Sequence, residues 1–172
     1  MKRWRQIVAG TEASEIAEMA MVMPVMFLVF LGIFWAGRSY NIYATINAAA
    51  REGARTAVSS SCASCGNAAS TDAAVVAAIT TSLAADRLNP ASVAAPTIVA
   101  PNKCGGGGAT ACPTTGNVAI CRNAQLTPPT VTPEVCGVVV QFNYPLDLAQ
   151  IPLMSAFGNP QIAARAQMKV EQ

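Results

Sequence analysis

The residues Met19–Gly37 read MAMVMPVMFLVFLGIFWAG and contain no charged side chain. As a helix rising 1.5 Å per residue, they span roughly 28 Å, close to the ~30 Å hydrocarbon core of a bilayer. The run is apolar on every side, whereas a helix that faces water on one side would carry a polar stripe. The stretch therefore predicts one transmembrane helix, which makes the lipid bilayer a partner of the chain.

Basic residues flank this stretch unequally. Lys2, Arg3 and Arg5 precede it, and only Arg38 follows it closely. Because the positive flank stays in the cytoplasm, we expect a single-pass protein of the cytoplasmic membrane with residues 59–172 outside the cytoplasm. The alternative is a cleaved secretory signal, but its apolar region would be unusually long, and no small-x-small cleavage site follows it closely.

Composition excludes several functions. The 172 residues carry a net charge of only +2, so no strong field points to nucleic acid. There is no histidine, which removes the commonest general base and transition-metal ligand. The acidic residues beyond the apolar stretch are scattered, and no pair of base and nucleophile can be assigned. We expect no enzymatic activity, no cofactor and no metal.

The rest of the chain predicts an α+β fold. Helical spacing of apolar residues extends the first helix over about 12–58, far beyond the membrane. A second helix is expected over about 73–88, with Thr71 or Asp72 as its cap and Asn89-Pro90 as its end. Short strands are expected over 92–99, 118–121, 135–144 and 162–170. The chain then divides into a leader (1–10), a transmembrane and extended helix (11–58), and a small domain (59–172) with a helix and an antiparallel sheet.

The last of these strands has the clearest pattern. Ile162, Ala164, Ala166, Met168 and Val170 alternate with more polar residues. Such alternation is typical of an antiparallel strand with one face buried and one face in water.

All six cysteines follow residue 60, on the side expected to be exported. Without histidine, zinc would require four thiolates, and three disulfides are the simpler interpretation in an oxidising compartment. Fifteen pairings are possible. Because local loops close easily, the preferred pairing is Cys62–Cys65, Cys104–Cys112 and Cys121–Cys136.

The residues Gly10-Thr11-Glu12-Ala13-Ser14-Glu15 link the basic leader to the apolar stretch. They resemble the class III signal of type IV prepilins, which prepilin peptidase cuts after the glycine. The resemblance implies cleavage between Gly10 and Thr11, retention of the apolar helix, and a role for Glu15 as partner of a neighbouring subunit's N-terminal amine. In the alternative interpretation, Glu15 only complements the helix dipole.

A second motif, NAAAREGARTA at Asn47–Ala57, resembles the AAREGAR segment of TadE-like proteins. Together with the preceding helix, this resemblance covers residues 10–58, and the strand near residues 162–171 agrees more loosely. TadE-like proteins are pilin-like membrane proteins of the bacterial Tad (tight adherence) system, which assembles Flp-type IVb pili. Since Flp pilins are much shorter and have an aromatic residue where this chain has Ile16, the resemblance implies a pseudopilin or assembly component.

The resemblance implies further partners, namely pilin, pseudopilins, the inner-membrane platform and prepilin peptidase. Arg51, Glu52 and Arg55 are candidates for a partner contact, since Arg51 and Arg55 lie one helical turn apart. Equally, they form the solvated end of a long helix.

Two other functions remain open. One is an envelope-anchored binding module unrelated to pili, which would hold its ligand with the cysteine-rich domain. The other is an envelope thiol oxidoreductase using Cys62 and Cys65, although these lie in a Ser/Ala/Gly loop without the strand and helix context of such enzymes.

Overall fold

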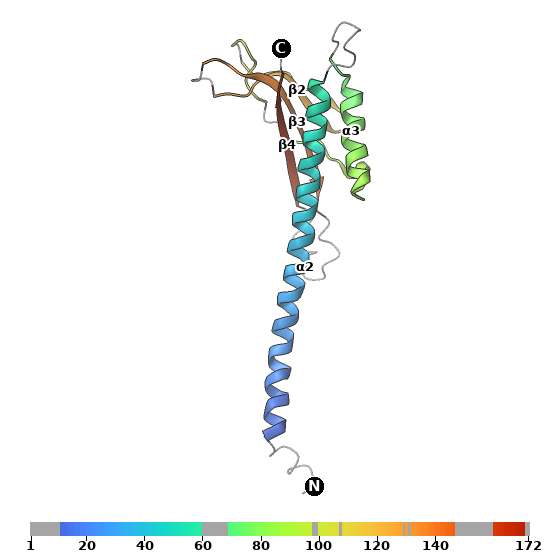
Figure 1. Cartoon of the computed structure of the whole chain (residues 1–172), viewed down its shortest axis with the longest axis vertical. Helices are drawn as coiled ribbons and strands as arrows, with labels where there is room; N and C mark the ends of the chain where they lie inside the picture. Colours follow the sequence, from blue (N-terminus) through green and yellow to red (C-terminus); the bar gives the residue numbers. More distant parts are fainter. Residues whose placement is uncertain are drawn as a thin grey trace. The chain divides into compact units, whose positions relative to one another are not determined.

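The computed structural model describes residues 11–59, 69–97, 100–106, 108–128, 130, 132–146 and 160–170, with side chains from residue 16 onward. Two compact units are present, Met1–Tyr40 and Asn41–Gln172, and each is described by itself. The predicted α+β class is confirmed: a long helix is followed by a second helix and a four-stranded antiparallel sheet (Figure 1).

The long helix α2 runs over Thr11–Val58, as predicted for about 12–58, and it contains Pro24. Within the first unit its large apolar side chains are exposed, for example Met21 at 78% and Phe30 at 63%. Among the described residues it is the one helix long and apolar enough to cross a membrane. Exposed side chains of this kind are stable in lipid and unfavourable in water.

The second unit begins with the last turns of α2 and continues with α3 (Asp72–Ala85). Thr71 caps α3 as predicted, since its hydroxyl accepts a hydrogen bond from the Ala74 amide. The helix ends three residues earlier than expected. Arg87 adopts φ 61°, and the amides of Arg87 and Leu88 donate to the carbonyls of Ala84 and Leu83. This Schellman motif ends the helix before Pro90 can.

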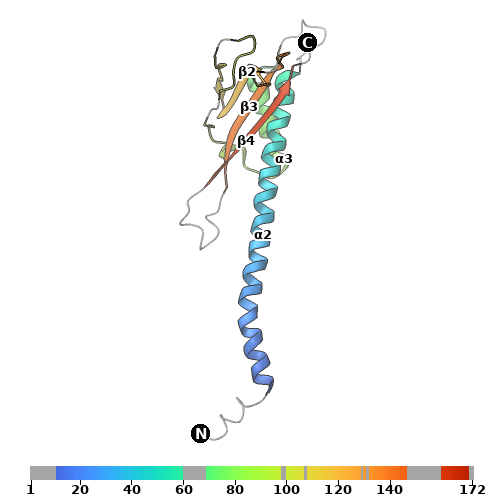
Figure 2. The same cartoon turned by 90° about the vertical axis from the view of Figure 1, so that its left-hand side faces the viewer.

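The sheet has the order β1-β2-β3-β4, and every pair is antiparallel (Figure 2). The strands are β1 (Thr114–Thr115), β2 (Val118–Gln125), β3 (Cys136–Pro145) and β4 (Gln161–Lys169). Gly116 and Asn117 both have positive φ and form the two-residue turn between β1 and β2. The alternation predicted for the last strand is confirmed, because Ala164 and Ala166 are buried between exposed neighbours.

The strand expected over residues 92–99 is wrong within the described part of the chain. Pro90–Ser92 forms a short 3-10 helix, and Ala94 makes a single bridge to Asn143 of β3. Pro96 has no amide hydrogen, so it cannot donate to a continuing ladder.

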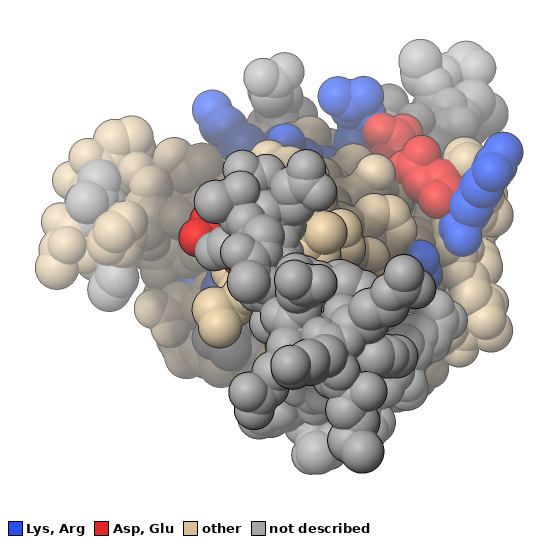
Figure 3. Space-filling view, turned by 90° about the horizontal axis from the view of Figure 1, so that it is seen from below, with Lys and Arg blue, Asp and Glu red and all other residues tan. Residues whose placement is uncertain are grey.

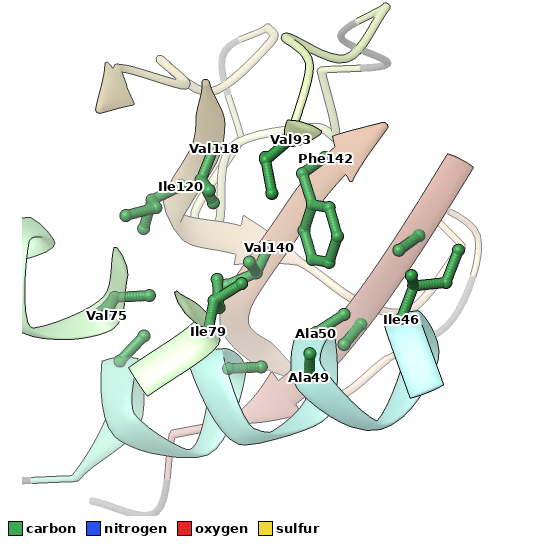
Figure 4. Packing of buried hydrophobic residues seen from close by; sticks show 14 of the residues in the cluster. Ile46, Ala49, Ala50, Val75, Ile79, Val93, Val118, Ile120, Val140 and Phe142 are labelled. Carbon is green, nitrogen blue, oxygen red and sulfur yellow. The ribbon is translucent and has the colours of Figure 1, made fainter. Parts of the chain in front are cut away.

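One hydrophobic core lies between the sheet and the two helices (Figure 4). Phe142 from β3 is its largest fully buried side chain, while α2 contributes Ile46 followed by small residues. The small residues let α2 lie close to its neighbours, and the branched side chains of α3 and the sheet fill the space. The other main members are Val75, Ile79, Leu83, Val93, Val118, Ile120, Val138, Val140 and Tyr144.

Candidate functional site

The motif at Asn47–Ala57 forms two different faces of α2. Ala49, Ala50 and Ala54 are fully buried in the core, and Ala57 is nearly so. Gly53 lies between them, and a Cβ atom placed on it would come within 2.6 Å of Ile79 Cγ1 on α3. Residues three and four apart share one side of a helix, so the small residues form one continuous packing face. The small residues of the motif therefore stabilise the fold by packing in the core.

The charged residues of the same motif lie on the opposite face. Arg51, Glu52 and Arg55 are all exposed. The Arg55 guanidinium lies 3.6 Å from the Glu52 carboxylate, but both side chains are at least half exposed, so this ion pair contributes little to stability. Arg51 has no acidic partner among the described residues. Arg51 is therefore available to an acidic group of another molecule.

Figure 3 shows charged side chains of the described residues on one face of the chain. Basic side chains lie along one edge of that view, with acidic side chains beside them. Attraction of an acidic partner would thus depend on local contacts, since the net charge is only +2.

Near the end of the apolar stretch, the Arg38 guanidinium lies over the ring of Trp35, 5.8 Å from its centroid. The same ring meets Phe34 edge to face. A tryptophan beside a cation is favourable at a membrane–water interface, where the ring has an apolar environment and the charge has water. The pair lies where the charge-free stretch Met19–Gly37 ends.

The predicted cleavage site is described only in part. Gly10 lies outside the described residues, and Thr11 and Glu15 are described by their backbone alone. Thr11 is the first residue of α2, so the bond expected to be cut joins the leader to the start of the helix.

The expected disulfide pairing is wrong for the four described cysteines. Cys104 is bonded to Cys136, and Cys112 to Cys121. The register of β1 and β2 pairs Thr114 with Ala119, which places residues 112 and 121 directly opposite each other. Strand pairing therefore selects Cys121 as the partner of Cys112. Cys62 and Cys65 lie outside the described residues.

Arg122, on β2, joins three segments and was missed by the sequence analysis. Its guanidinium donates to the Asp72 carboxylate (2.8 and 3.2 Å), to the Ser70 carbonyl (2.7 Å) and to the Ala57 carbonyl (3.2 Å). The cation thus meets the C-terminal end of α2, and its acidic partner sits at the N-terminal end of α3. Both placements complement the helix dipoles.

A break in the ladder of β2 accompanies this position. The register between β2 and β3 shifts between Cys121 and Ala124, and Asn123 has φ 55°. Such bulges turn a side chain away from its regular direction. In the sequence, Arg122 directly follows the apolar run Val118–Cys121, and this was the signal that could have identified the contact.

We expect Arg122→Ala to lower the free energy of unfolding by about 2 kcal/mol, because it leaves a half-buried carboxylate and two carbonyls without this donor. Arg122→Lys should recover less than half of the loss, since an ammonium cannot reproduce the fork of donors. Denaturation of the full chain in detergent micelles measures both. Arg165→Ala is the control, because Arg165 is exposed and has no ion pair with a described residue. Equal effects of Arg122→Ala and the control would contradict the structural role of Arg122.

Fold and site together define an α+β protein whose N-terminal helix is long and apolar enough to cross a membrane. Residues 14–55 match the family model of TadE-like protein, so the predicted resemblance is confirmed over this segment. The match includes the apolar stretch and ends within the two-faced motif, while α3 and the sheet lie beyond it. No curated protein and no solved structure matches the chain.

Proposed function

We propose that this chain is a membrane-anchored pseudopilin or assembly component of a bacterial Tad (Flp, type IVb) pilus system. The proposal rests on the observation that the segment matched by the family model, residues 14–55, has two parts with different surfaces. Its first part is an exposed apolar helix, and its last part uses small residues for the fold while leaving Arg51, Glu52 and Arg55 exposed. A charged surface with no role in the fold is available for a partner.

In this proposal the protein spans the cytoplasmic membrane once, with its N-terminus in the cytoplasm. The asymmetry of Lys2, Arg3 and Arg5 against Arg38 supports this orientation. The two disulfides support an exported position for the second unit, because thiols stay reduced in the cytoplasm. The proposed role is structural rather than enzymatic, with other Tad pilus components and prepilin peptidase as its partners.

A pilus assay tests the role of the charged face. In a strain that lacks the gene, we expect the wild-type chain to restore surface pili and Arg51→Glu/Arg55→Glu to leave piliation near that of the deletion strain. Two reversed charges turn attraction to an acidic partner into repulsion. Sheared pili are quantified, and the fraction is probed for the chain itself.

The matched control is Ala77→Glu/Thr81→Glu. It adds two carboxylates one turn apart at exposed positions of α3. Both doubly substituted chains must reach the membrane at the wild-type level with unchanged thermal stability. Normal pili in the deletion strain would reject the proposal and favour an envelope-anchored binding module. If Ala77→Glu/Thr81→Glu reduced piliation as much as Arg51→Glu/Arg55→Glu, the assignment of Arg51 and Arg55 to a partner contact would be rejected.

A further inference from the structure

The last strand of the sheet has one edge without a partner among the described residues. β4 is terminal in the order β1-β2-β3-β4 and pairs with β3 over all nine residues (Figure 2). Long, regular edge strands present unpaired amides and carbonyls that can bind another strand. Edge strands in many proteins are short, and this one is long.

The register shows which backbone groups face the open edge. The amide of Val170 donates to the Cys136 carbonyl, and the amide of Leu146 donates to the Pro160 carbonyl. Both contacts continue the ladder of β3 and β4 at even-numbered positions of the β4 segment. Because bonded pairs alternate with non-bonded pairs in an antiparallel ladder, the odd-numbered residues direct their backbone groups away from β3. These residues are Gln161, Ala163, Arg165, Gln167 and Lys169, and all five are exposed.

The same odd-numbered residues place two cations on one face of the sheet. Arg165 and Lys169 are four residues apart, a distance of about 13 Å along a strand. Their partners across the ladder are Gln141 and Gly137, and the four strands contain no acidic residue. Neither cation has an ion pair with a described residue. Within the described part of the chain, the edge therefore combines unpaired backbone groups with two cations that have no ion pair.

We infer that the outer edge of β4 binds an extended segment of another protein, with carboxylates at alternate positions, as an added antiparallel strand. The backbone groups would provide the hydrogen bonds, and Arg165 and Lys169 would select for acidic side chains. A second copy of β4 fits poorly, because that strand carries two cations and no acid, and like charges opposite each other are destabilising. The proposal stands independently of any role in pili.

The test uses the full chain in lipid nanodiscs, with a probe strand fused after Gln172 through a glycine–serine linker. One probe alternates threonine and glutamate, and its control alternates threonine and lysine. The linker makes binding intramolecular, so weak pairing becomes measurable. Hydrogen exchange is followed residue by residue along β4.

With the glutamate probe, exchange should slow by about tenfold or more at the amides of residues 163, 165 and 167, with little change at residues 164 and 166. The lysine probe should give no protection. Arg165→Glu/Lys169→Glu should reverse this preference between the probes. Ala163→Pro should abolish protection without loosening the ladder, because the amide of Ala163 points away from β3, whereas Ala164→Pro removes a bond to β3.

Equal protection by both probes would overturn the proposed selectivity, and no protection by either probe would overturn strand addition itself. Protection of the odd-numbered amides in the chain without a probe, together with dimers, would replace the proposed occupant by a second copy of the chain. Loss of pili in the assay above has no bearing on these outcomes, so the two proposals can fail separately.

Discussion

Replacing Gly10 with valine should leave the ten-residue leader on the protein in cells that contain prepilin peptidase. The resemblance to class III signals places the cut after this glycine, and a branched side chain at the cut bond should block it. Cleavage after Gly10 would remove Lys2, Arg3 and Arg5 and lower the formal charge from +2 to −1. The uncut variant should keep its cytoplasmic anchor of positive charge and stay in the membrane fraction.

N-terminal sequencing and intact mass distinguish the two forms. Wild-type protein should begin at Thr11, the first residue of α2, and the valine variant at Met1. Ala9→Val is the matched control, since it places the same side chain one residue earlier. A wild-type chain that keeps Met1 would remove processing from the proposal and leave the membrane anchor.

Glu15→Ala separates assembly from processing. We propose that Glu15 pairs with the N-terminal amine of a neighbouring subunit, and a carboxylate at the edge of the hydrocarbon is costly without such a partner. The variant should be cleaved normally but should disappear from sheared pili. If Glu15 only complemented the helix dipole, its loss would cost roughly 0.3–1 kcal/mol and assembly would be unaffected. Glu18→Ala, at an exposed position in the next turn, is the control.

Gly53→Leu should destabilise the second unit by about 3 kcal/mol. The observation behind this is the 2.6 Å approach of Ile79 Cγ1 to the position where a Cβ of residue 53 would lie, with Ile79 Cδ1 at 2.7 Å. Neither helix can accommodate the added side chain without moving, because Ile79 is fully buried in the core. Thermal or chemical denaturation of the full chain in micelles measures the loss.

A double substitution makes this prediction specific. Ile79→Ala alone should cost about 2–5 kcal/mol through the cavity it leaves. In Gly53→Leu/Ile79→Ala the leucine can occupy part of that cavity. The double variant should therefore lose less stability than the sum of the losses in the two single variants. Ala48→Leu, at an exposed position of α2, should change stability by less than about 0.5 kcal/mol. Additive effects of the two substitutions would contradict direct contact between Gly53 and Ile79.

Several features of the fold followed from short-range patterns in the sequence. The helix predicted over 12–58 is observed as Thr11–Val58, because the length of its apolar stretch and the helical spacing of its apolar residues depend on neighbouring residues alone. The alternation in β4 predicted its buried face for the same reason. The strand expected over residues 92–99 was wrong because Pro96 interrupts this short apolar run and cannot donate to a ladder.

The disulfide pairing could not be predicted from short-range patterns alone. A preference for short loops paired Cys104 with Cys112, whereas the structure bonds Cys112 to Cys121. The Gly116-Asn117 turn lies midway between Cys112 and Cys121 and was the available signal. The partner of Cys104 is 32 residues away, and no local pattern indicates it.

By itself, the sequence determined the long apolar helix, the α+β class and the family resemblance, since each depends on composition and spacing along a continuous stretch. Only the tertiary structure decided that the small residues around Gly53 pack against α3 while Arg51 and Arg55 remain exposed. It also decided that Arg122 joins the ends of both helices and that the outer edge of β4 has no partner strand among the described residues. The physical reason is that these features arise from contacts between segments far apart in the chain, whose register and close approach are set when the whole core packs together.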